Sequence, residues 1–259
     1  MPTYAVLGAT GNTGQSLLHV LSQSPDPKIQ INAYVRSKSK LLRLSPNLAS
    51  ANNVRIFEGD LHNISLISEC ISGTKAVFMA VAVSDNVPGC NIALDTAHTV
   101  VAALEKLHSK DPYAKLPRLI CLSSASLNDY LCHDLPQVVH WMLLNAFSYI
   151  YADLIKAEEY LRSHKDWITS TFVKPGGLVH DEQKGHTLST EKQQTFLSFL
   201  DLAAGMVEIA DTEGDKWDMK NVSVLPTAKD VKISWVSATV VMRGLLFSCF
   251  PSLYPFINW

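Results

Sequence analysis

Three glycines near the beginning of the chain have a spacing that suits phosphate binding. Gly8, Gly11 and Gly14 follow a short apolar run, Tyr4–Leu7, and precede a helical pattern that starts at Gln15. The first glycine permits a tight turn, the second lets the backbone approach a pyrophosphate, and the third lets helix and strand pack closely. Free N–H groups at the start of the helix favour the same anion. The alternative is a glycine-rich structural turn. We predict a dinucleotide site whose loop residues are Gly8, Thr10, Gly11, Asn12, Thr13 and Gly14.

The turn after the second predicted strand indicates which dinucleotide binds. That strand, Ile29–Val35, is followed by the basic segment Arg36–Lys40, which contains no carboxylate to accept hydrogen bonds from the adenosine ribose. Arg36, with Ser37 and Lys40 beside it, can instead hold a 2′-phosphate through charge-assisted hydrogen bonds. The alternative is a solvated basic turn. The sequence therefore predicts NADP(H) as the cofactor.

Two further segments are expected to complete the nucleotide site. Asp60 and Leu61 follow the third predicted strand, Asn53–Phe57, where the carboxylate can accept from the adenine amino group and the leucine can pack on the ring. Asp60 can equally cap the next helix, and the two roles are compatible. The fourth predicted strand, Ala76–Val83, is a nearly continuous apolar run typical of the centre of a parallel sheet, and its Ala80 is expected to contact the cofactor.

The order of the elements indicates the fold class. The pattern further predicts strands at 119–122 and 167–173 and helices at 15–22, 66–71, 92–107 and 138–161, the last of them broken near 145–148. Strands that alternate with helices imply βαβ units. We predict an α/β fold, a Rossmann-type doubly wound parallel sheet.

The last third of the chain is less regular. It is predicted to contain a polar loop at 180–190, a helix at 196–210, a short strand at 222–225 and a terminal helix from Ser234. We expect one NAD(P)-binding domain over residues 1–259. Residues from about 180 to 259 are expected to contribute a small substrate-side lobe at the carboxyl ends of the strands.

Composition excludes several classes of function. The 259 residues contain 22 Lys and Arg against 24 Asp and Glu, for a net charge of −2, which argues against a nucleic-acid partner held by bulk electrostatics. The five cysteines form no Cys-x-x-Cys pair, and no His-Glu-x-x-His pattern occurs, so neither a disulfide framework nor a metal is expected. The sequence has no Gly-x-Ser-x-Gly elbow of a serine hydrolase.

No membrane span or targeting segment is expected either. The chain runs from Met1 into a strand without a basic segment, and the apolar stretch Trp235–Phe250 has only 16 residues and contains Arg243. A spanning helix needs roughly 20 apolar residues. We expect a cytoplasmic protein, and the sequence does not distinguish a monomer from a homodimer.

Together these motifs resemble the NmrA-like, atypical branch of the short-chain dehydrogenase/reductase superfamily. The resemblance covers roughly residues 3–180 and is carried by the glycine loop, Val35-Arg36, Glu58–Leu61, Ser123-Ser124 and Trp167–Gly176. The opening of the chain and the segment 34–40 are also similar to small fungal proteins of the averufin oxidase A type, which tailor aromatic polyketides. The resemblance implies an NADP(H)-dependent oxidoreductase that acts on an aromatic, polyketide-like small molecule in secondary metabolism.

The resemblance also implies catalytic residues. In the superfamily a tyrosine four residues before a lysine donates the proton, and a serine after the fifth strand orients the substrate carbonyl, here Ser124. Four residues before Lys156 stands Ala152, and Tyr151 comes one position too early, rotated by about 100° on a regular helix. Either the helix is distorted so that Tyr151 substitutes, or Lys156 or another donor serves, or there is no acid–base step.

Other roles follow from the same resemblance. Lys156 would bind the nicotinamide ribose if it faces inward, the alternative being a surface salt bridge to Asp153 or Glu159. Ser124 has the alternative role of a turn-capping hydroxyl. Additional cofactor contacts are expected at Ser123, Pro175 and Gly176, the last two through backbone groups facing the carboxamide, and substrate contacts at Tyr130, His140 and Trp141. Two other functions stay open: a non-redox isomerase, cyclase or dehydratase on this fold, and an NmrA-like regulator that senses NADP.

Overall fold

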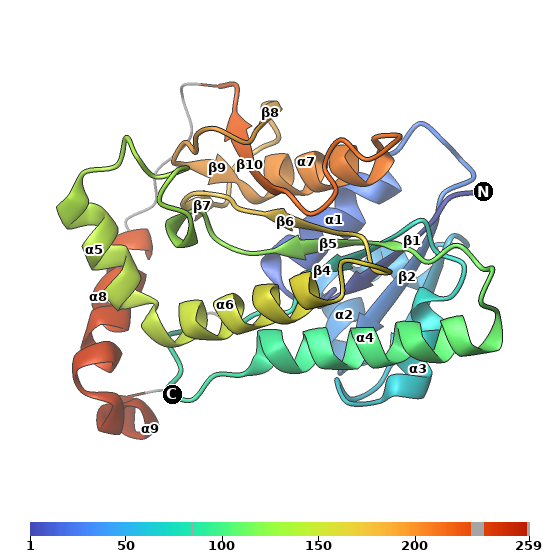
Figure 1. The fold of residues 1–259 in the computed structure, drawn as a ribbon, viewed down its shortest axis with the longest axis horizontal. Coiled ribbons are helices and arrows are strands. Elements are labelled where there is room, and N and C mark those ends of the chain that lie inside the picture. Colours follow the sequence, from blue (N-terminus) through green and yellow to red (C-terminus); the bar gives the residue numbers. More distant parts are fainter. Residues whose placement is uncertain (84, 229–235, 258–259) are drawn as a thin grey trace.

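The strands form one eight-stranded sheet in the order β3-β2-β1-β4-β5-β6-β10-β8 (Figure 1). The computed structural model describes residues 1–83, 85–228 and 236–257. All neighbouring strands in this sheet are parallel except β10 and β8. Its strands are β1 (Thr3–Leu7), β2 (Gln30–Val35), β3 (Val54–Glu58), β4 (Ala76–Met79), β5 (Arg118–Leu122), β6 (Ser170–Val173), β8 (His186–Ser189) and β10 (Asn221–Pro226).

The strand order reverses next to β1, as a doubly wound sheet requires. The chain proceeds from β1 outward to β2 and β3, and then returns to place β4 on the other side of β1. Ligands in such sheets bind at the carboxyl ends of the strands near this point. Strand β4 ends at Met79, earlier than the predicted Val83, because its neighbour β1 also ends there: Ala80 N donates to Leu7 O at 3.0 Å, and the Gly8 turn then leads the chain away.

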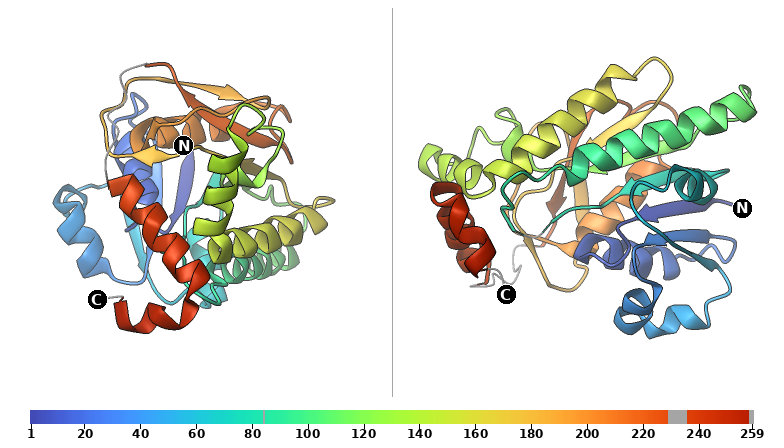
Figure 2. Two further views of the ribbon diagram at one scale, coloured as in Figure 1. Left: turned by 90° about the vertical axis from the view of Figure 1, so that its left-hand side faces the viewer. Right: turned by 90° about the horizontal axis from the view of Figure 1, so that it is seen from below.

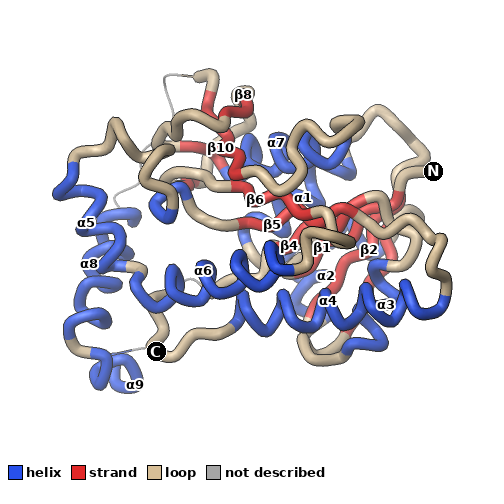
Figure 3. The backbone as a smooth tube through the Cα atoms, viewed as in Figure 1, coloured by secondary structure: helices blue, strands red, loops and turns tan. Residues whose placement is uncertain are grey.

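Helices cover both faces of the sheet (Figure 3). One apolar cluster joins α1 and α7 to the strands, and a second joins α3, α4 and α6 to the opposite face. The helices of these layers are α1 (Asn12–Ser22), α2 (Lys38–Leu44), α3 (Ile64–Ile71), α4 (Ile92–Lys110), α6 (Ser148–Ser163) and α7 (Phe199–Asp211), with short 3-10 turns at Pro46–Ala49 and Ala125–Leu127.

The long helical segment before β6 is broken, as predicted. Helices α5 (Gln137–Ala146) and α6 meet at an angle of 86°. In the part of the chain that the structure describes, no single helix is long and apolar enough to cross a membrane, although α5 and α6 reach that length and composition when they are taken together.

The terminal helices lie beside α5. Helix α8 (Val236–Cys249) packs on α5 at one end of the molecule and is followed by a 3-10 turn (Pro251–Leu253) and α9 (Tyr254–Ile257) (Figure 2). The contact is close, because a Cβ atom on Gly244 would overlap the carbonyl oxygen of Ala146. The predicted helix start at Ser234 lies outside the described residues.

The last third of the chain differs from the expected lobe. Strands β10 and β8 extend the main sheet, and α7 packs on α1, so residues 186–226 belong largely to the core. The polar segment predicted as a loop at 180–190 contains β8, which pairs antiparallel with β10. Helix α7 begins at Phe199 rather than 196 because β9 (Leu197–Ser198) first pairs with β7 (Leu178–Val179).

Candidate functional site

The glycine loop has the geometry that nucleotide binding requires. Gly8 has a φ of +85°, and a Cβ there would lie 2.5 Å from the carbonyl oxygen of Ala80. A Cβ on Gly14 would overlap the Gly8 carbonyl, so this glycine is needed for packing between helix and strand. Gly11 differs, because its Cβ position has only ordinary contacts, the closest at 3.4 Å. Gly11 is the N-cap residue of α1, so this open space lies at the start of the helix.

That N-terminus is suited to an anion. Gly11 is the N-cap residue, no side chain caps the helix, and the first turn contains no acidic residue. Gly11 and Asn12 are exposed, Thr10 is half-buried, and Thr13 is buried beneath them. The N–H groups of the first turn can therefore donate to a pyrophosphate. The predicted contacts of individual loop residues stay predictions.

The turn after β2 presents a cation, with an acid close by. Arg36 is exposed and makes no hydrogen bond or ion pair to any residue that the structure describes. Ser37 caps α2, accepting from Lys40 N at 3.2 Å, and the Lys40 side chain is exposed. Glu58, at the end of β3, accepts from Lys38 N at 2.9 Å. A carboxylate from the neighbouring strand thus supports a turn that has no acid of its own, a feature that the local sequence did not reveal.

Asp60 does not cap α3. Its carboxylate accepts from His62 N at 2.8 Å, and the N-cap of α3 is Asn63, which accepts from Leu66 N at 3.1 Å. The capping alternative is therefore wrong. Asp60 is exposed and Leu61 half-buried at the carboxyl end of β3, where adenine contacts stay a prediction.

A serine and a tyrosine meet where β5 ends. Ser124 Oγ donates to Tyr151 Oη at 3.1 Å, and the Tyr151 ring packs against Phe147, with centroids 5.6 Å apart. Burial raises the pKa of Tyr151, while hydrogen bonds from Ser124 and Ser126 act in the opposite direction. Tyr151 is therefore a protonated phenol at neutral pH, with its own O–H available to a ligand. This places Tyr151 beside Ser124 as the substitution hypothesis requires. Residues 148–163 form one uninterrupted α-helix, so this contact involves no break within α6.

Lys156 lies on the outer face of α6, contrary to the expectation that it faces the ribose. It is exposed, and five positions after Tyr151 correspond to a rotation of about 140° around the helix. Neither expected partner holds it in place. Asp153 is buried and instead caps α4, accepting from Ala93 N at 2.8 Å and Leu94 N at 3.0 Å. Glu159 forms no ion pair with it among the described residues.

The hydroxyl of Ser123 points toward α6, on the face of the sheet that α3, α4 and α6 cover, and not toward the carboxyl ends of the strands. It donates to Glu158 of α6, which also accepts from Lys174 Nζ at 2.6 Å. Lys174, the residue after β6, has an exposed fraction of only 1%, and its Nζ lies 3.3 Å from Ser123 Oγ. Burial lowers the pKa of Lys174, and the Glu158 carboxylate opposes this.

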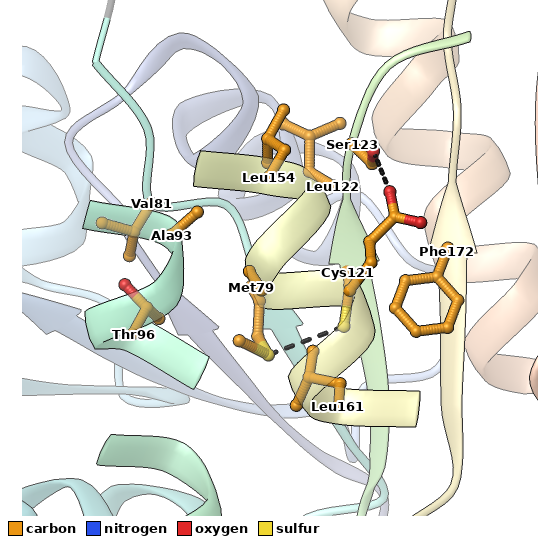
Figure 4. Close-up of a pocket in the computed structure, with 12 residues that line it drawn as sticks. Met79, Val81, Ala93, Thr96, Cys121, Leu122, Ser123, Leu154, Leu161 and Phe172 are labelled. Atoms are coloured by element: carbon orange, nitrogen blue, oxygen red, sulfur yellow. Dashed lines mark hydrogen bonds between the residues drawn. The ribbon is translucent and has the colours of Figure 1, made fainter. Parts of the chain in front are cut away.

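This network borders a small internal cavity. The cavity, of about 30 Å³, lies between the sheet and helices α4 and α6, and Met79, Cys121, Ser123 and Phe172 are among its lining (Figure 4). The sequence reasoning missed the Lys174–Glu158 pair. The only local signal was a lysine directly after a buried strand, since the partner comes from a helix 16 residues earlier.

The three residues predicted to contact the substrate, Tyr130, His140 and Trp141, do not lie together. His140 Nε2 lies 2.9 Å from Ser126 O, close to Tyr151, and the buried Cys132 donates to Ala125 O at 3.2 Å. Tyr130 and Trp141 are 64% and 63% exposed, so they do not form a pocket wall with His140. His140 and Trp141 differ because consecutive residues of an α-helix are about 100° apart and so project in different directions.

The Pro175–Gly176 turn after β6 is covered by a later segment. A Cβ on Gly176 would collide with the side chains of Gln193 and Thr195, and Gly177 N donates to Thr195 Oγ1 at 3.2 Å. Contacts of this turn with a cofactor stay predictions. The sequence did not indicate that Gln193 and Thr195 lie beside this turn.

Comparisons with known proteins agree with this geometry. A family described as NAD(P)H-binding matches residues 8–213. Oxidoreductase aflX from Aspergillus parasiticus is 53% identical over 258 residues, covering 100% of this chain and 96% of that protein. Oxidoreductase stcQ from Emericella nidulans is 49% identical over 260 residues, covering 100% and 95%.

Solved structures support the fold. A short-chain dehydrogenase/reductase from Veillonella parvula in complex with NADP aligns with a TM-score of 0.67 at 19% identity, covering 90% of this chain and 99% of that one. The chain belongs to the NAD(P)H-binding family whose model it matches and, with the relatives above, to a family of oxidoreductases found in fungi.

Proposed function

We propose that this protein is an NADP(H)-dependent oxidoreductase that acts on an aromatic, polyketide-like small molecule in secondary metabolism. The observation that carries the proposal is the contact of Ser124 with Tyr151 at the carboxyl end of the sheet. This contact places a phenol and a hydroxyl at the same end of the sheet as the N–H groups of the glycine loop. The substrate class rests on the resemblance to fungal polyketide-tailoring proteins.

The residues present fit a phosphorylated dinucleotide. The open Cβ position of Gly11 and the uncapped start of α1 suit the pyrophosphate, and Arg36, which has no partner in the described part of the chain, suits a 2′-phosphate. Ser37 and Lys40 lie next to Arg36 in the same turn. Glu58 reduces the preference for NADPH over NADH, because its carboxylate accepts from the backbone of this turn and adds a negative charge near the 2′-phosphate.

Tyr151 provides the proton in this mechanism. A bound nicotinamide supplies the hydride that reduces a carbonyl. Ser124 donates to Tyr151 Oη, so the phenolic proton is directed away from the serine and toward a substrate oxygen. As the C=O π bond breaks, this oxygen takes the proton of Tyr151, and the phenolate left behind is stabilised by the hydroxyls of Ser124 and Ser126 until solvent restores the proton.

A non-redox reaction is the second candidate, and the position of Lys156 favours it. An exposed Lys156 leaves no lysine of α6 to orient a nicotinamide ribose, whereas Tyr151 and His140 beside Ser126 could still move protons in an isomerisation or dehydration.

Turnover assays separate these functions. The purified protein is mixed with NADPH and a panel of aromatic ketones and quinones, and loss of NADPH absorbance is followed together with product formation. Substrate-dependent oxidation of NADPH that is lost in Ser124→Ala supports the proposal. Conversion without any nucleotide would establish the non-redox reaction. Nucleotide binding with no conversion across the panel would favour a sensor of the NmrA kind.

A further inference from the structure

The segment from Gln193 to Phe196 lies directly on the turn after β6. Side chains from this segment occupy the space beside Gly176 and Gly177, and a Cβ on either glycine would come within 3.0 Å of them. Leu197 N donates to Gly177 O at 2.9 Å, so the two stretches run side by side into β9 and β7. The glycine pair is required here because another chain segment approaches the backbone closely.

Gln193 also connects the turn to the catalytic side of the site. Its backbone N–H donates to Leu131 O at 3.1 Å. Leu131 precedes Cys132, whose thiol lies near enough to Tyr151 to influence the phenol. The residue is therefore fixed between the strand ends that carry the two halves of the proposed site, β5 with Ser124 and β6 with Pro175.

A chain of hydrogen bonds orients the Gln193 side chain. Gly177 N donates to Thr195 Oγ1 at 3.2 Å, and Thr195 Oγ1 donates to Gln193 Oε1 at 3.0 Å. The amide oxygen of Gln193 is thereby assigned as an acceptor. Its Nε2 has no partner among the described residues, and the side chain is half-buried rather than free in solvent. Two N–H donors are thus held next to the turn without an acceptor from residues 1–83, 85–228 or 236–257.

We propose that Gln193 is a nucleotide-positioning residue whose Nε2 donates a hydrogen bond to the carboxamide oxygen of the nicotinamide. The inference rests on the proposed function, which expects the nicotinamide end of the nucleotide at the Pro175–Gly176 turn. A primary amide whose oxygen is held by Thr195 presents its N–H donors in a fixed direction, and the carboxamide oxygen of a nicotinamide is a matching acceptor. Thr195 acts indirectly, by holding the Gln193 amide in the orientation that presents Nε2.

The test measures binding with and without the nicotinamide half of the ligand. Dissociation constants are determined by calorimetry for NADPH and for adenosine 2′,5′-bisphosphate, which keeps the adenosine with its 2′- and 5′-phosphates and lacks the nicotinamide riboside. The variants are Gln193→Ala, Gln193→Glu and Thr195→Val. Gln194→Ala is the matched control, since it removes the same side chain one position later, where the residue is exposed and has no side-chain hydrogen bond to a described residue.

Gln193→Ala should weaken NADPH binding about three- to tenfold, the effect of one neutral hydrogen bond. Gln193→Glu should weaken it further, because a carboxylate replaces the donor. Thr195→Val should change it in the same direction by a smaller factor. Binding of the bisphosphate should be unchanged in every variant, and Gln194→Ala should match the parent for both ligands.

The outcomes distinguish this inference from the proposed function. If the parent protein binds neither ligand, the proposed function itself fails. If the parent binds NADPH and Gln193→Ala binds it equally well, only the role of Gln193 is overturned. An equal loss for NADPH and the bisphosphate would also overturn it, because the effect would then come from a general change in the site. Thermal unfolding of each variant confirms that it is folded.

Discussion

Replacing Tyr151 by Phe should abolish most of the turnover while leaving the protein folded and able to bind nucleotide. The change removes one oxygen that accepts from Ser124 at 3.1 Å and keeps the ring that packs on Phe147. Loss of one such hydrogen bond should cost about 1 kcal/mol of stability. Loss of a positioned proton donor should lower kcat/KM by about 10²–10⁴, or about 3–5 kcal/mol of transition-state stabilisation.

Lys156→Ala is the matched control on the same helix. This lysine is exposed and has no ion pair among the described residues, so kcat/KM should stay within about twofold of the parent and stability within about 0.5 kcal/mol. Both variants are assayed with NADPH and the best substrate of the panel, and their dissociation constants for NADPH are measured separately. The reasoning is refuted if Lys156→Ala loses as much activity as Tyr151→Phe, because Lys156 would then face the site during turnover. Full activity in Tyr151→Phe would refute the proton-donor role.

Four further results are expected. Arg36→Ala should weaken NADPH binding by about 1–3 kcal/mol and leave NADH binding nearly unchanged, which titration of both nucleotides would show. Gly11→Val should prevent nucleotide binding without unfolding the protein, because a side chain there meets only ordinary protein contacts but would occupy space that a bound pyrophosphate needs, as binding and circular dichroism would reveal. Lys174→Met should lower the free energy of unfolding in urea by about 2 kcal/mol, because Glu158 loses its closest cation and keeps only the hydrogen bond from Ser123 and the 3.9 Å ion pair with Arg162. Reduction should keep its rate up to about pH 10, because a raised pKa keeps the phenol of Tyr151 protonated above the range of an ordinary tyrosine, and a pH–rate profile would test this.

The first half of the fold could be predicted because its signals are local. An apolar run such as Ala76–Met79 is buried on both faces in a parallel sheet, and the glycine spacing reports one turn between one strand and one helix. Strand β8 lacked such a signal. His186–Ser189 is polar and half-buried, and it becomes a strand only because the edge of β10 offers a partner.

The chemistry of the site depended on tertiary relations that spacing does not encode. Tyr151 lies in the first turn of α6, directly after the 86° bend from α5, and its hydrogen bond with Ser124 joins residues that are 27 positions apart. The neighbours Ser123 and Ser124 look alike in the sequence, yet the alternation along a strand sends one hydroxyl to Glu158 and the other to Tyr151. Gln193 lies near the site because the segment that contains it leads into β9, which pairs with β7, and each of these strands has only two residues.

The outward position of Lys156 bears on which role Tyr151 can take in proton transfer. A tyrosine that serves as a base must first lose its proton, and a nearby cation makes that loss easier. Here burial raises the pKa of Tyr151 and two serine hydroxyls only partly offset it. Lys174 does not replace the missing charge, because it is paired with Glu158 and buried on the helix-covered face of the sheet. At neutral pH the phenol of Tyr151 therefore holds the proton that reduction of a substrate carbonyl would consume, whereas oxidation of an alcohol would need the phenolate.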